Sequence, residues 1–325
     1  MTLWGRLARR PSHGSIETRR LETPDGDFVD LLRLPAPPTA PRVLVLHGLE
    51  GSGHSHYIGA LFNEMRRRGW GMDVLLFRSC GREANRMPRF YHSGETGDLA
   101  HVLDVLMQEF PNVDFVLAGF SLGGNVLLKW LGERRNTLPF RLRAAVAVSV
   151  PFDLARSSRR IGTGFSKVYE QAFLRSLKHK AQAKARQFPA HPVLRRLEPA
   201  TSLYQFDDMV TAPLHGFRDA GDYYSRSSSI SFLSTISLPT LLLSAIDDPF
   251  LPSEVLDSVR RIADGNPALT AEFVPRGGHV GFVGGRWPWK PVYYAERRIA
   301  EFCAGHLEQG GSRDEPALFY RDLEE

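Results

Sequence analysis

Short apolar runs and segments of helical periodicity alternate along the first 150 residues of the chain. The apolar runs are rich in β-branched and aromatic residues and have the length of strands. They predict strands at Phe28–Leu34, Val43–Leu46, Asp73–Phe77, Val113–Ala118 and Arg143–Val150. Apolar positions at helical spacing predict helices over 57–68 and 99–110. Strands that alternate with helices are typical of a parallel sheet covered on both faces.

The alternation stops over residues 151–237, where the pattern is helical and irregular. One helix in this stretch is expected to bury an apolar face made of Phe165, Val168, Tyr169, Ala172, Phe173 and Leu177. The strand pattern resumes at Pro239–Ala245 and ends with Ala271–Val274. Between these two strands we expect a helix capped by Ser253, and after them a last helix that begins at Pro291.

One sheet domain with a helical insertion explains the length of 325 residues better than two independent domains. The expected core comprises residues 26–150 and 238–307, and the insertion comprises residues 151–237. Residues 1–25 are expected to form a loosely structured N-terminal arm, and residues 308–325 a polar tail. Because the insertion begins directly after a strand, we expect it to cover the cleft at that edge of the sheet.

The amino-acid composition indicates the cellular compartment of the protein. Hydrophobic residues make up 42% of the chain, which is enough for a sizeable core, and no apolar run approaches the ~20 residues of a membrane helix. The basic N-terminus has no continuous apolar segment, so we predict no signal peptide. Cys80 and Cys303 are the only cysteines, which fits a reducing compartment. We therefore predict a cytoplasmic location.

Basic clusters raise the question of an anionic partner. The formal net charge is +5, and arginine clusters stand at 66–68 and 159–160. Further basic residues, at 178–180 and 184–186, lie in the predicted insertion beside apolar positions. These clusters are either solvated surfaces or sites of peripheral contact with a membrane. No nucleic-acid-binding motif is present, so we predict no nucleic-acid partner.

The stretch Val113–Gly132 joins a predicted strand to a predicted helix through Gly119-Phe120-Ser121-Leu122-Gly123. Strand, G-x-S-x-G and helix in this order predict a nucleophile elbow. Small residues on both sides of Ser121 would let the strand and the helix approach closely. The helix would direct its N-terminal amides toward the same cleft, where they favour negative charge.

A serine is inert near neutral pH unless a base takes its proton. His279 is the candidate base, because it lies in a Gly-rich loop just past the last predicted strand. Parallel strands place their carboxyl ends at one edge, so Ser121 and His279 should share that edge. Asp247 and Asp248 follow the preceding predicted strand, and one of them should orient the imidazole.

An oxyanion formed by attack on a carbonyl needs preorganised amides. Leu122 can donate one amide as the residue after the nucleophile, and Leu49 follows an earlier strand at the same edge. We expect these two amides to form the oxyanion hole. His54 and His56 lie near His47, but no cysteine or carboxylate cluster supports a metal site there.

Many motifs in a fixed order make the chain resemble the α/β-hydrolases, and specifically the branch of the bacterial YheT-like hydrolases and their lipase-like animal relatives. The matching pieces are HGLEGSGHSHY (47–57), RSCG (78–81), YHSGET (91–96), GFSLGGN (119–125), PFDL (151–154), GF with DYY (216–224), DDPF (247–250) and GGHVGF (277–282). The match extends from about residue 20 to residue 305.

The resemblance implies an α/β-hydrolase fold, with a mostly parallel central sheet, helices on both faces and a helical cap. It implies esterase or lipase-like activity on small or lipid acyl esters, with Ser121, Asp248 and His279 as the triad and no cofactor. The superfamily spacing of a small residue, the aspartate and a proline fits Ala245, Asp248 and Pro252, and this favours Asp248 over Asp247. The alternatives are an acyltransferase that passes the acyl group to an alcohol, and a catalytically silent protein that uses the pocket for binding.

Overall fold

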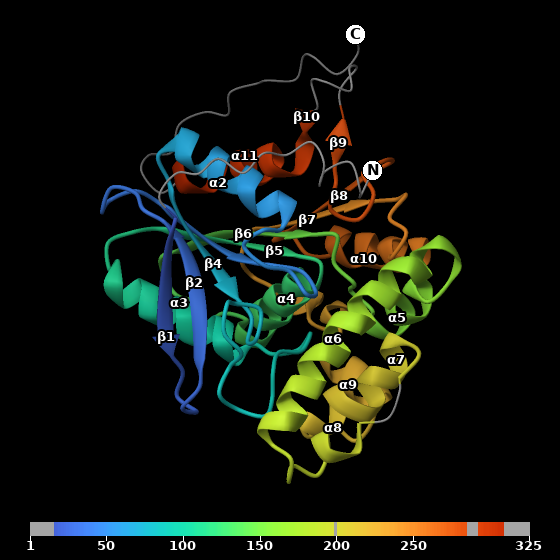
Figure 1. Ribbon diagram of the computed structural model, residues 1–325. Coiled ribbons are helices and arrows are strands. Elements are labelled where there is room, and N and C mark those ends of the chain that lie inside the picture. The colour runs from blue at the N-terminus through green and yellow to red at the C-terminus, as the bar shows by residue number, and fades with distance from the viewer. Residues whose placement is uncertain (1–15, 198–199, 285–291, 309–325) are drawn as a thin grey trace.

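A computed structural model describes residues 16–197, 200–284 and 292–308 (Figure 1). In these residues an eight-stranded sheet has the order β1-β2-β4-β3-β5-β6-β7-β8. Its strands are β1 (Glu17–Glu22), β2 (Phe28–Leu34), β3 (Arg42–Leu46), β4 (Gly71–Leu76), β5 (Phe115–Phe120), β6 (Leu142–Val148), β7 (Thr240–Ala245) and β8 (Leu269–Val274). A separate two-stranded ribbon pairs β9 (Val283–Gly284) with β10 (Val292–Tyr293).

The sheet is mostly parallel, which confirms the prediction from the alternating pattern. Strands β3 to β8 all run in the same direction, so every pair that they form with one another is parallel. Strand β2 pairs antiparallel with β1 on one side and with β4 on the other. Parallel strands bring their carboxyl ends to one edge, so the loops after β3, β5, β7 and β8 meet there.

Helices cover both faces of the sheet (Figure 1). Helices α2 (His56–Arg68) and α11 (Tyr294–Glu308) lie on one face, and α3 (Gly97–Glu109), α4 (Leu122–Arg134) and α10 (Ser253–Asp264) lie on the other. Side chains of the strands alternate between the two cores, as Val43 and Val45 pack with α2 while Leu44 and Leu46 pack with α3 and α4. The central strands are therefore apolar on both faces.

A group of helices between β6 and β7 lies beside the sheet domain (Figure 1). It consists of α5 (Leu154–Ile161), α6 (Lys167–Gln187), α7 (Leu203–Phe206), a π-helical turn (Asp207–Thr211), α8 (Ala212–Leu214), α9 (Ala220–Ser227) and short 3₁₀ turns (Gly164–Ser166, Leu194–Arg196, Ser229–Ser231 and Leu233–Thr235). We call α5 to α9, with the turns between them, the cap layer. Its buried side chains form two apolar clusters, and the larger one also includes Phe90 and Phe250 from loops of the sheet domain.

The expectation of a loose arm over residues 1–25 is wrong for its last part, because Glu17–Glu22 form strand β1. Only Leu21 of this strand is buried, and Arg20 pairs with Asp30 of β2 at 2.8 Å. A charged strand is typical of a sheet edge, where water solvates both faces, and its sequence therefore lacks the apolar pattern of a buried strand. Residues 1–15 lie outside the described residues.

Two predicted helix starts are also wrong. Ser253 is the first residue of α10 and makes no side-chain cap, since Pro252 occupies the cap position. Helix α11 begins at Tyr294, after the short strand β10. Pro291 and the predicted tail after residue 308 lie outside the described residues.

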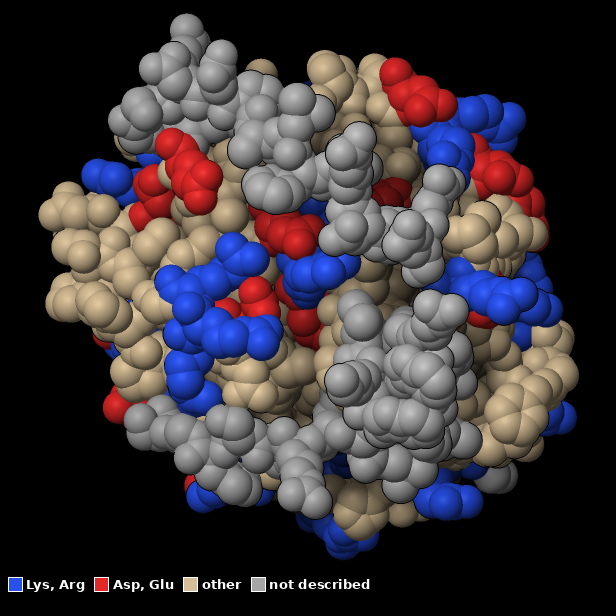
Figure 2. All heavy atoms as spheres, turned by 90° about the horizontal axis from the view of Figure 1, so that it is seen from above, with Lys and Arg blue, Asp and Glu red and all other residues tan. Residues whose placement is uncertain are grey.

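Charges of both signs share the face that carries α2 and α11 (Figure 2). Arg67 and Arg68 both pair with Glu64 on α2, and Arg298 of α11 pairs with Glu272 at 2.8 Å. The arginine cluster at 66–68 thus lies on a mixed surface. In the part of the chain that the structure describes, no helix has the length and apolar character needed to cross a membrane.

A buried arginine joins the chain before β2 to α3. Arg78 is 3% exposed and donates to Asp98 at 2.7 Å, to Asp25 at 2.7 Å and to Asp27 at 3.1 Å. Asp27 is fully buried and Asp98 is 4% exposed. Because charges out of water need a partner, this arginine compensates carboxylates from two distant parts of the sequence.

Replacing Arg78 with methionine should lower the free energy of unfolding by about 3–5 kcal/mol, because two buried carboxylates would lose their cation. The matched control is Arg86→Met, since Arg86 pairs with Glu22 on the surface, where the two side chains are 48% and 64% exposed. That change should leave the free energy of unfolding nearly unchanged, because an exposed ion pair contributes little to stability. Denaturant unfolding of both variants measures the difference, and equal losses would contradict this interpretation.

Candidate active site

Ser121 occupies a strained turn between β5 and α4. Its φ is 51°, in the left-handed region that residues other than glycine rarely adopt. A Cβ on Gly119 would lie 2.6 Å from the carbonyl oxygen of Gly123, and one on Gly123 would lie 2.5 Å from that of His47. Glycine is therefore required at both positions, and the predicted close approach of strand and helix is observed.

The structure brings Ser121, His279 and Asp248 together in one hydrogen-bonded chain. His279 Nε2 lies 2.9 Å from Ser121 Oγ, and its Nδ1 lies 2.8 Å from Asp248 Oδ2. His279 and Asp248 are 7% and 3% exposed. With Nδ1–H donated to the carboxylate, Nε2 carries the lone pair that can take the serine proton.

The neighbouring carboxylates of Asp247 and Asp248 make different contacts. Asp247 Oδ1 accepts the amides of Gly277 and Gly278, both at 2.8 Å, and so holds the turn before His279. Asp248 uses Oδ2 for the imidazole and Oδ1 for the amide of Phe250, at 2.9 Å. The structure thus places Asp248 on the imidazole, as the spacing predicts, and gives Asp247 a place in the supporting turn.

Leu49 and Leu122 border the same cavity as Ser121. Both residues line the pocket that contains Ser121 and His279. Leu122 is the first residue of α4, and neither amide donates to an acceptor among the residues that the structure describes. A Cβ on Gly48 would lie 3.2 Å from the Cβ of Ser121, so the loop that carries Leu49 is close to the serine. Free amides at this point can stabilise an oxyanion.

His47 holds the loop that carries Leu49. It is fully buried, and burial lowers its pKa to about 4, so the ring is neutral. Its Nε2 accepts the amide of Phe77 at 3.1 Å, and Nδ1 donates to the carbonyl of Gly48 at 2.8 Å. Both ring nitrogens are therefore occupied by backbone groups, and the described residues contain no cluster of ligands suited to a metal ion.

Glu50, next to Leu49, is held by the cap layer. Its φ of 53° is unusual for a non-glycine residue. The hydroxyl of Tyr91 accepts the Glu50 amide at 2.8 Å and donates to its carboxylate at 2.7 Å. Lys180 of α6 donates to the same carboxylate at 2.6 Å, and the hydroxyl of Ser176 also donates to it. Helix α6 thus fixes the conformation of the loop beside the serine.

The basic residues of α6 do not form the predicted cluster on one face. Lys180 points inward to Glu50, and Lys184 is only 2% exposed and donates to the carbonyls of Asn85 and Met87. Burial lowers the pKa of Lys184 to about 8. A helical pattern alone cannot show that a lysine is buried, because long polar side chains are usually assigned to the solvent face.

The apolar face predicted for α6 is only partly correct. Phe173 and Leu177 line the pocket, whereas Phe165 and Val168 are 73% and 62% exposed. The buried stripe of α6 consists of Glu170, Leu174, Leu177, Ala181 and Lys184. Two of these are charged, and Glu170 is buried because its carboxylate accepts the amide of Leu203 at 2.9 Å. A prediction from the spacing of hydrophobic residues alone therefore places the buried face of α6 at the wrong position around the helix.

Ser121 opens into a pocket between the sheet domain and the cap layer, with about 880 Å³ of empty space including its mouth. The wall between the serine and the far end of the pocket is largely apolar. Its apolar residues from the cap layer are Leu154, Ile161, Phe173, Leu177 and Leu203. Phe250 lies beside His279, with ring centroids 4.4 Å apart. This arrangement can exclude water from the reacting bond.

Asn125 is a residue to which the sequence analysis gave no role. It is fully buried on α4, and its side-chain amide donates to the carbonyls of Ser93 and Ser227 while its oxygen accepts the amide of Ser229. It therefore ties the elbow helix to the loop after β4 and to the end of the cap layer. The sequence signal was its position in GFSLGGN, but its partners lie 32 to 104 residues away.

Residues 41–285 match the family model described as the alpha/beta hydrolase fold. YheT of Escherichia coli (strain K12), whose name assigns it provisionally to the esterases, is 40% identical over 312 residues, which cover 94% of this chain and 90% of that protein.

Two further matches are more distant. The monoacylglycerol lipase of Saccharomyces cerevisiae is 28% identical over 302 residues, which cover 89% of this chain and 63% of the lipase. The esterase Pf2001 of Pyrococcus furiosus, a solved structure, matches with a TM-score of 0.59 and 17% identity, covering 91% of this chain and 92% of that one. At this identity the solved structure shows the fold alone.

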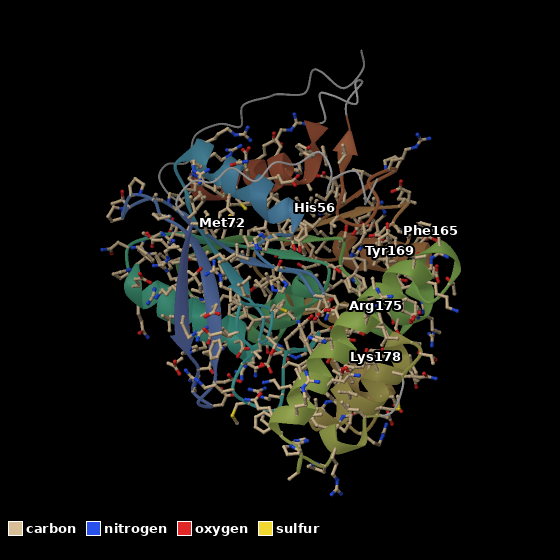
Figure 3. All side chains as sticks on the ribbon, viewed as in Figure 1. His56, Met72, Phe165, Tyr169, Arg175 and Lys178 are labelled. Carbon is tan, nitrogen blue, oxygen red and sulfur yellow. The ribbon has the colours of Figure 1, made fainter. Side chains whose placement is uncertain are left out.

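Lys180→Met should lower the free energy of unfolding by about 3 kcal/mol, near the lower end for a buried pair, because the Glu50 carboxylate would lose its cation. The side chains of Lys180 and Glu50 are 17% and 7% exposed. Lys178→Met is the control, since Lys178 lies on the same helix (Figure 3) and forms no ion pair among the described residues. Thermal or denaturant unfolding measures the loss of stability in both variants. An equal loss in Lys178→Met and Lys180→Met would contradict a stabilising role for the ion pair between Lys180 and Glu50.

Proposed function

Because the chain belongs to the α/β-hydrolase family, in its YheT-like branch, we propose that it is a serine hydrolase of carboxylic esters. The observation that carries the proposal is the hydrogen-bonded chain from Ser121 through His279 to Asp248, at 2.9 and 2.8 Å. The names of the esterase and monoacylglycerol lipase relatives support esters as the substrate class. The largely apolar pocket supports an acyl or alkyl group beside the reacting carbonyl.

The proposed reaction proceeds through an acyl-enzyme. His279 takes the proton of Ser121 as Oγ attacks the ester carbonyl, and the imidazolium is stabilised by Asp248. The amides of Leu49 and Leu122 receive the oxyanion, where one such donor is typically worth about 3–4 kcal/mol in the transition state. His279 then protonates the leaving alcohol, and water attacks the acyl-enzyme by the same route. No step needs a cofactor.

Labelling with a fluorophosphonate tests whether the serine is activated. The wild-type protein should react and gain the mass of one phosphonyl group at Ser121, whereas Ser121→Ala should not react. Ser121→Ala should also lose nearly all ester hydrolysis, on the order of 10⁶-fold if the triad acts as a unit. A folded wild-type protein that neither reacts nor hydrolyses esters would instead support a silent binding protein. Formation of a new ester when an alcohol replaces water would support the acyltransferase.

The two aspartates provide a matched pair of substitutions. Asp248→Asn should keep the geometry but favour the wrong histidine tautomer, at a cost of ~10⁴-fold in kcat by analogy with the serine proteases. Asp247→Asn should keep most of the activity, because its remaining carbonyl oxygen can still accept the amides of Gly277 and Gly278. The kcat of both variants is measured on one short ester. A mild Asp248→Asn with a crippled Asp247→Asn would reverse the assignment.

Two phenylalanines of the cap layer should differ in their effect on acyl-chain preference. Phe173 lines the pocket, so Phe173→Ala should shift the preference among esters of different length by ~1–3 kcal/mol, toward longer chains. Phe165 is 73% exposed and lies outside the pocket lining, so Phe165→Ala should leave the preference unchanged. The comparison uses kcat/KM across a series of ester lengths. Loss of activity toward every ester in Phe173→Ala, with the fold intact, would contradict a role in chain selection.

A further inference from the structure

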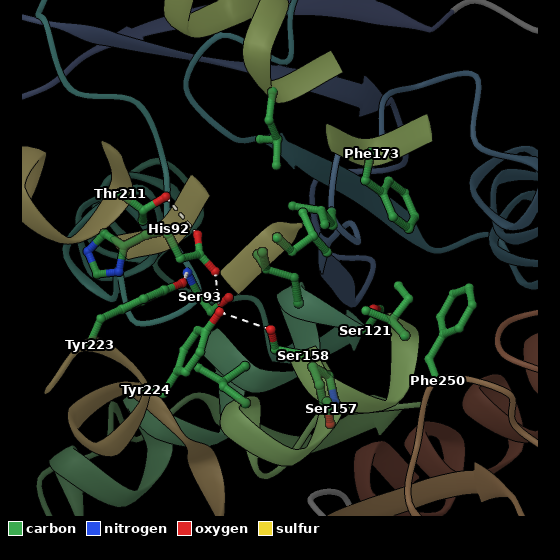
Figure 4. Close-up of a pocket in the computed structure, with 18 of the residues that line it drawn as sticks. His92, Ser93, Ser121, Ser157, Ser158, Phe173, Thr211, Tyr223, Tyr224 and Phe250 are labelled. Carbon is green, nitrogen blue, oxygen red and sulfur yellow. Dashed lines mark hydrogen bonds between the residues drawn. The ribbon is translucent and has the colours of Figure 1, made fainter. Parts of the chain in front are cut away.

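The pocket has a polar end, away from the serine. Figure 4 shows Ser121, Phe173 and Phe250 toward one side of the pocket and Thr211, Tyr223 and Tyr224 toward the other. Toward that end lie Asp207 and Thr211 of the π-helical turn and Tyr223 and Tyr224 of α9, and Ser157 and Ser158 of α5 line the pocket between them and Ser121. None of these residues has a part in the ester chemistry described above, so their presence in the same cavity needs an explanation.

Asp207 is a carboxylate without a cation. Its Oδ1 accepts the hydroxyl of Thr211 at 2.7 Å, and its Oδ2 accepts the hydroxyl of Tyr224 at 2.7 Å. Among the described side chains none forms an ion pair with it. Burial raises its pKa to about 6, against the hydrogen bonds from Tyr224 and Thr211, which lower it. Asp207 nevertheless keeps part of its surface accessible and lines the pocket, so lone pairs can face a ligand.

The hydroxyl groups around Asp207 are arranged as a chain of donors. Tyr224 Oη lies 2.7 Å from Asp207 and 3.1 Å from Ser158 Oγ. A phenol has one proton, and the charged acceptor at the shorter distance takes it, so Ser158 donates to Tyr224. Every hydroxyl proton of this chain is then directed toward the carboxylate.

Ser157 and Tyr223 are two further hydroxyl groups in the pocket that can form hydrogen bonds with a ligand. Ser157 is 7% exposed, and its hydroxyl oxygen has no partner among the described residues. Tyr223 is 3% exposed, and its oxygen accepts the amide of Ser93 at 2.9 Å. The Ser93 hydroxyl also interacts with this phenol, so the phenolic proton can be directed to Ser93 or to a ligand. A buried hydroxyl without a partner is costly, so a group that enters the pocket would gain by bonding to it.

We propose that this polar end binds a hydroxyl group of the substrate, and that the enzyme acts on esters with a hydroxyl remote from the reacting carbonyl. The hydroxyl donates to Asp207 and accepts from Ser157 or Tyr223. The apolar wall between Ser121 and the polar end holds the carbon chain that separates the two groups. This inference rests on the proposed ester hydrolysis for its substrate class, but the binding site itself does not depend on turnover.

A hydroxyl fits better than a charged group. It both donates and accepts, and the polar end offers both an acceptor in Asp207 and a donor in Tyr223. An ammonium group only donates, so it could not accept a hydrogen bond from the hydroxyl of Ser157, which has no partner among the described residues. A carboxylate only accepts, and Asp207 would repel it.

Binding to the Ser121→Ala protein tests the inference without turnover. Titration calorimetry compares methyl ω-hydroxyalkanoates with methyl alkanoates of the same number of heavy atoms, over a series of chain lengths. At the length that spans the pocket, the hydroxy ester should bind about 10–100-fold more tightly, since a hydrogen bond to a charged group contributes about 1.5–3 kcal/mol. Adding Asp207→Asn should remove most of this preference.

Asp208→Asn is the matched control, because Asp208 is the next residue, lies outside the pocket lining and accepts the amide of Ala220 at 2.9 Å. It should keep the preference for the hydroxy ester. Ser157→Ala should reduce the preference and serves if Asp207→Asn does not fold. Equal binding of the two esters at every length, or tighter binding of an ω-ammonium or ω-carboxylate ester, would overturn the inference. A hydroxyl preference in a protein that hydrolyses no ester would instead overturn the proposed function alone.

Discussion

The close backbone contact between the elbow and the loop after β3 is the constraint on which the site depends. Gly123 lies so near the carbonyl of His47 that no side chain fits between them, and Ser121 is held at positive φ in the same turn. This contact brings the serine beside the amides of Leu49 and Leu122. His47, neutral and bonded to backbone groups through both nitrogens, keeps the loop in place. The arrangement is therefore fixed before any substrate enters.

The cap layer also contacts the loop that carries Leu49, through its longest helix, α6. Lys180 and Ser176 of α6 hold the carboxylate of Glu50, the residue next to Leu49. Lys184 on the same helix binds carbonyls of the loop after β4. Any movement of α6 would therefore change the position of the loop that carries the Leu49 amide. The cap layer and the loop beside Ser121 are therefore physically linked through these few side chains.

Much of the fold could be predicted from the sequence, because buried parallel strands and amphipathic helices have distinct periods. Chain order and strand ends also sufficed to predict that Ser121, His279 and an aspartate would meet. Charged residues inside the protein could not be predicted. Strand β1 is too polar to show a strand pattern, and the inward side chains of Glu170 and Lys184 shift the buried face of α6. The partners of Asn125 and Asp207 are set by three-dimensional packing between distant segments.

If Ser121 is the nucleophile, it becomes acylated during turnover, and rapid quenching followed by intact-mass and peptide analysis detects the acyl group. An activated ester such as p-nitrophenyl acetate is mixed with the wild-type protein and quenched in acid within the first turnover. We expect a transient gain of one acetyl group per chain, located on Ser121, that decays as acetate is released. Steady ester hydrolysis with no acyl adduct, or with the adduct on another residue, would contradict it.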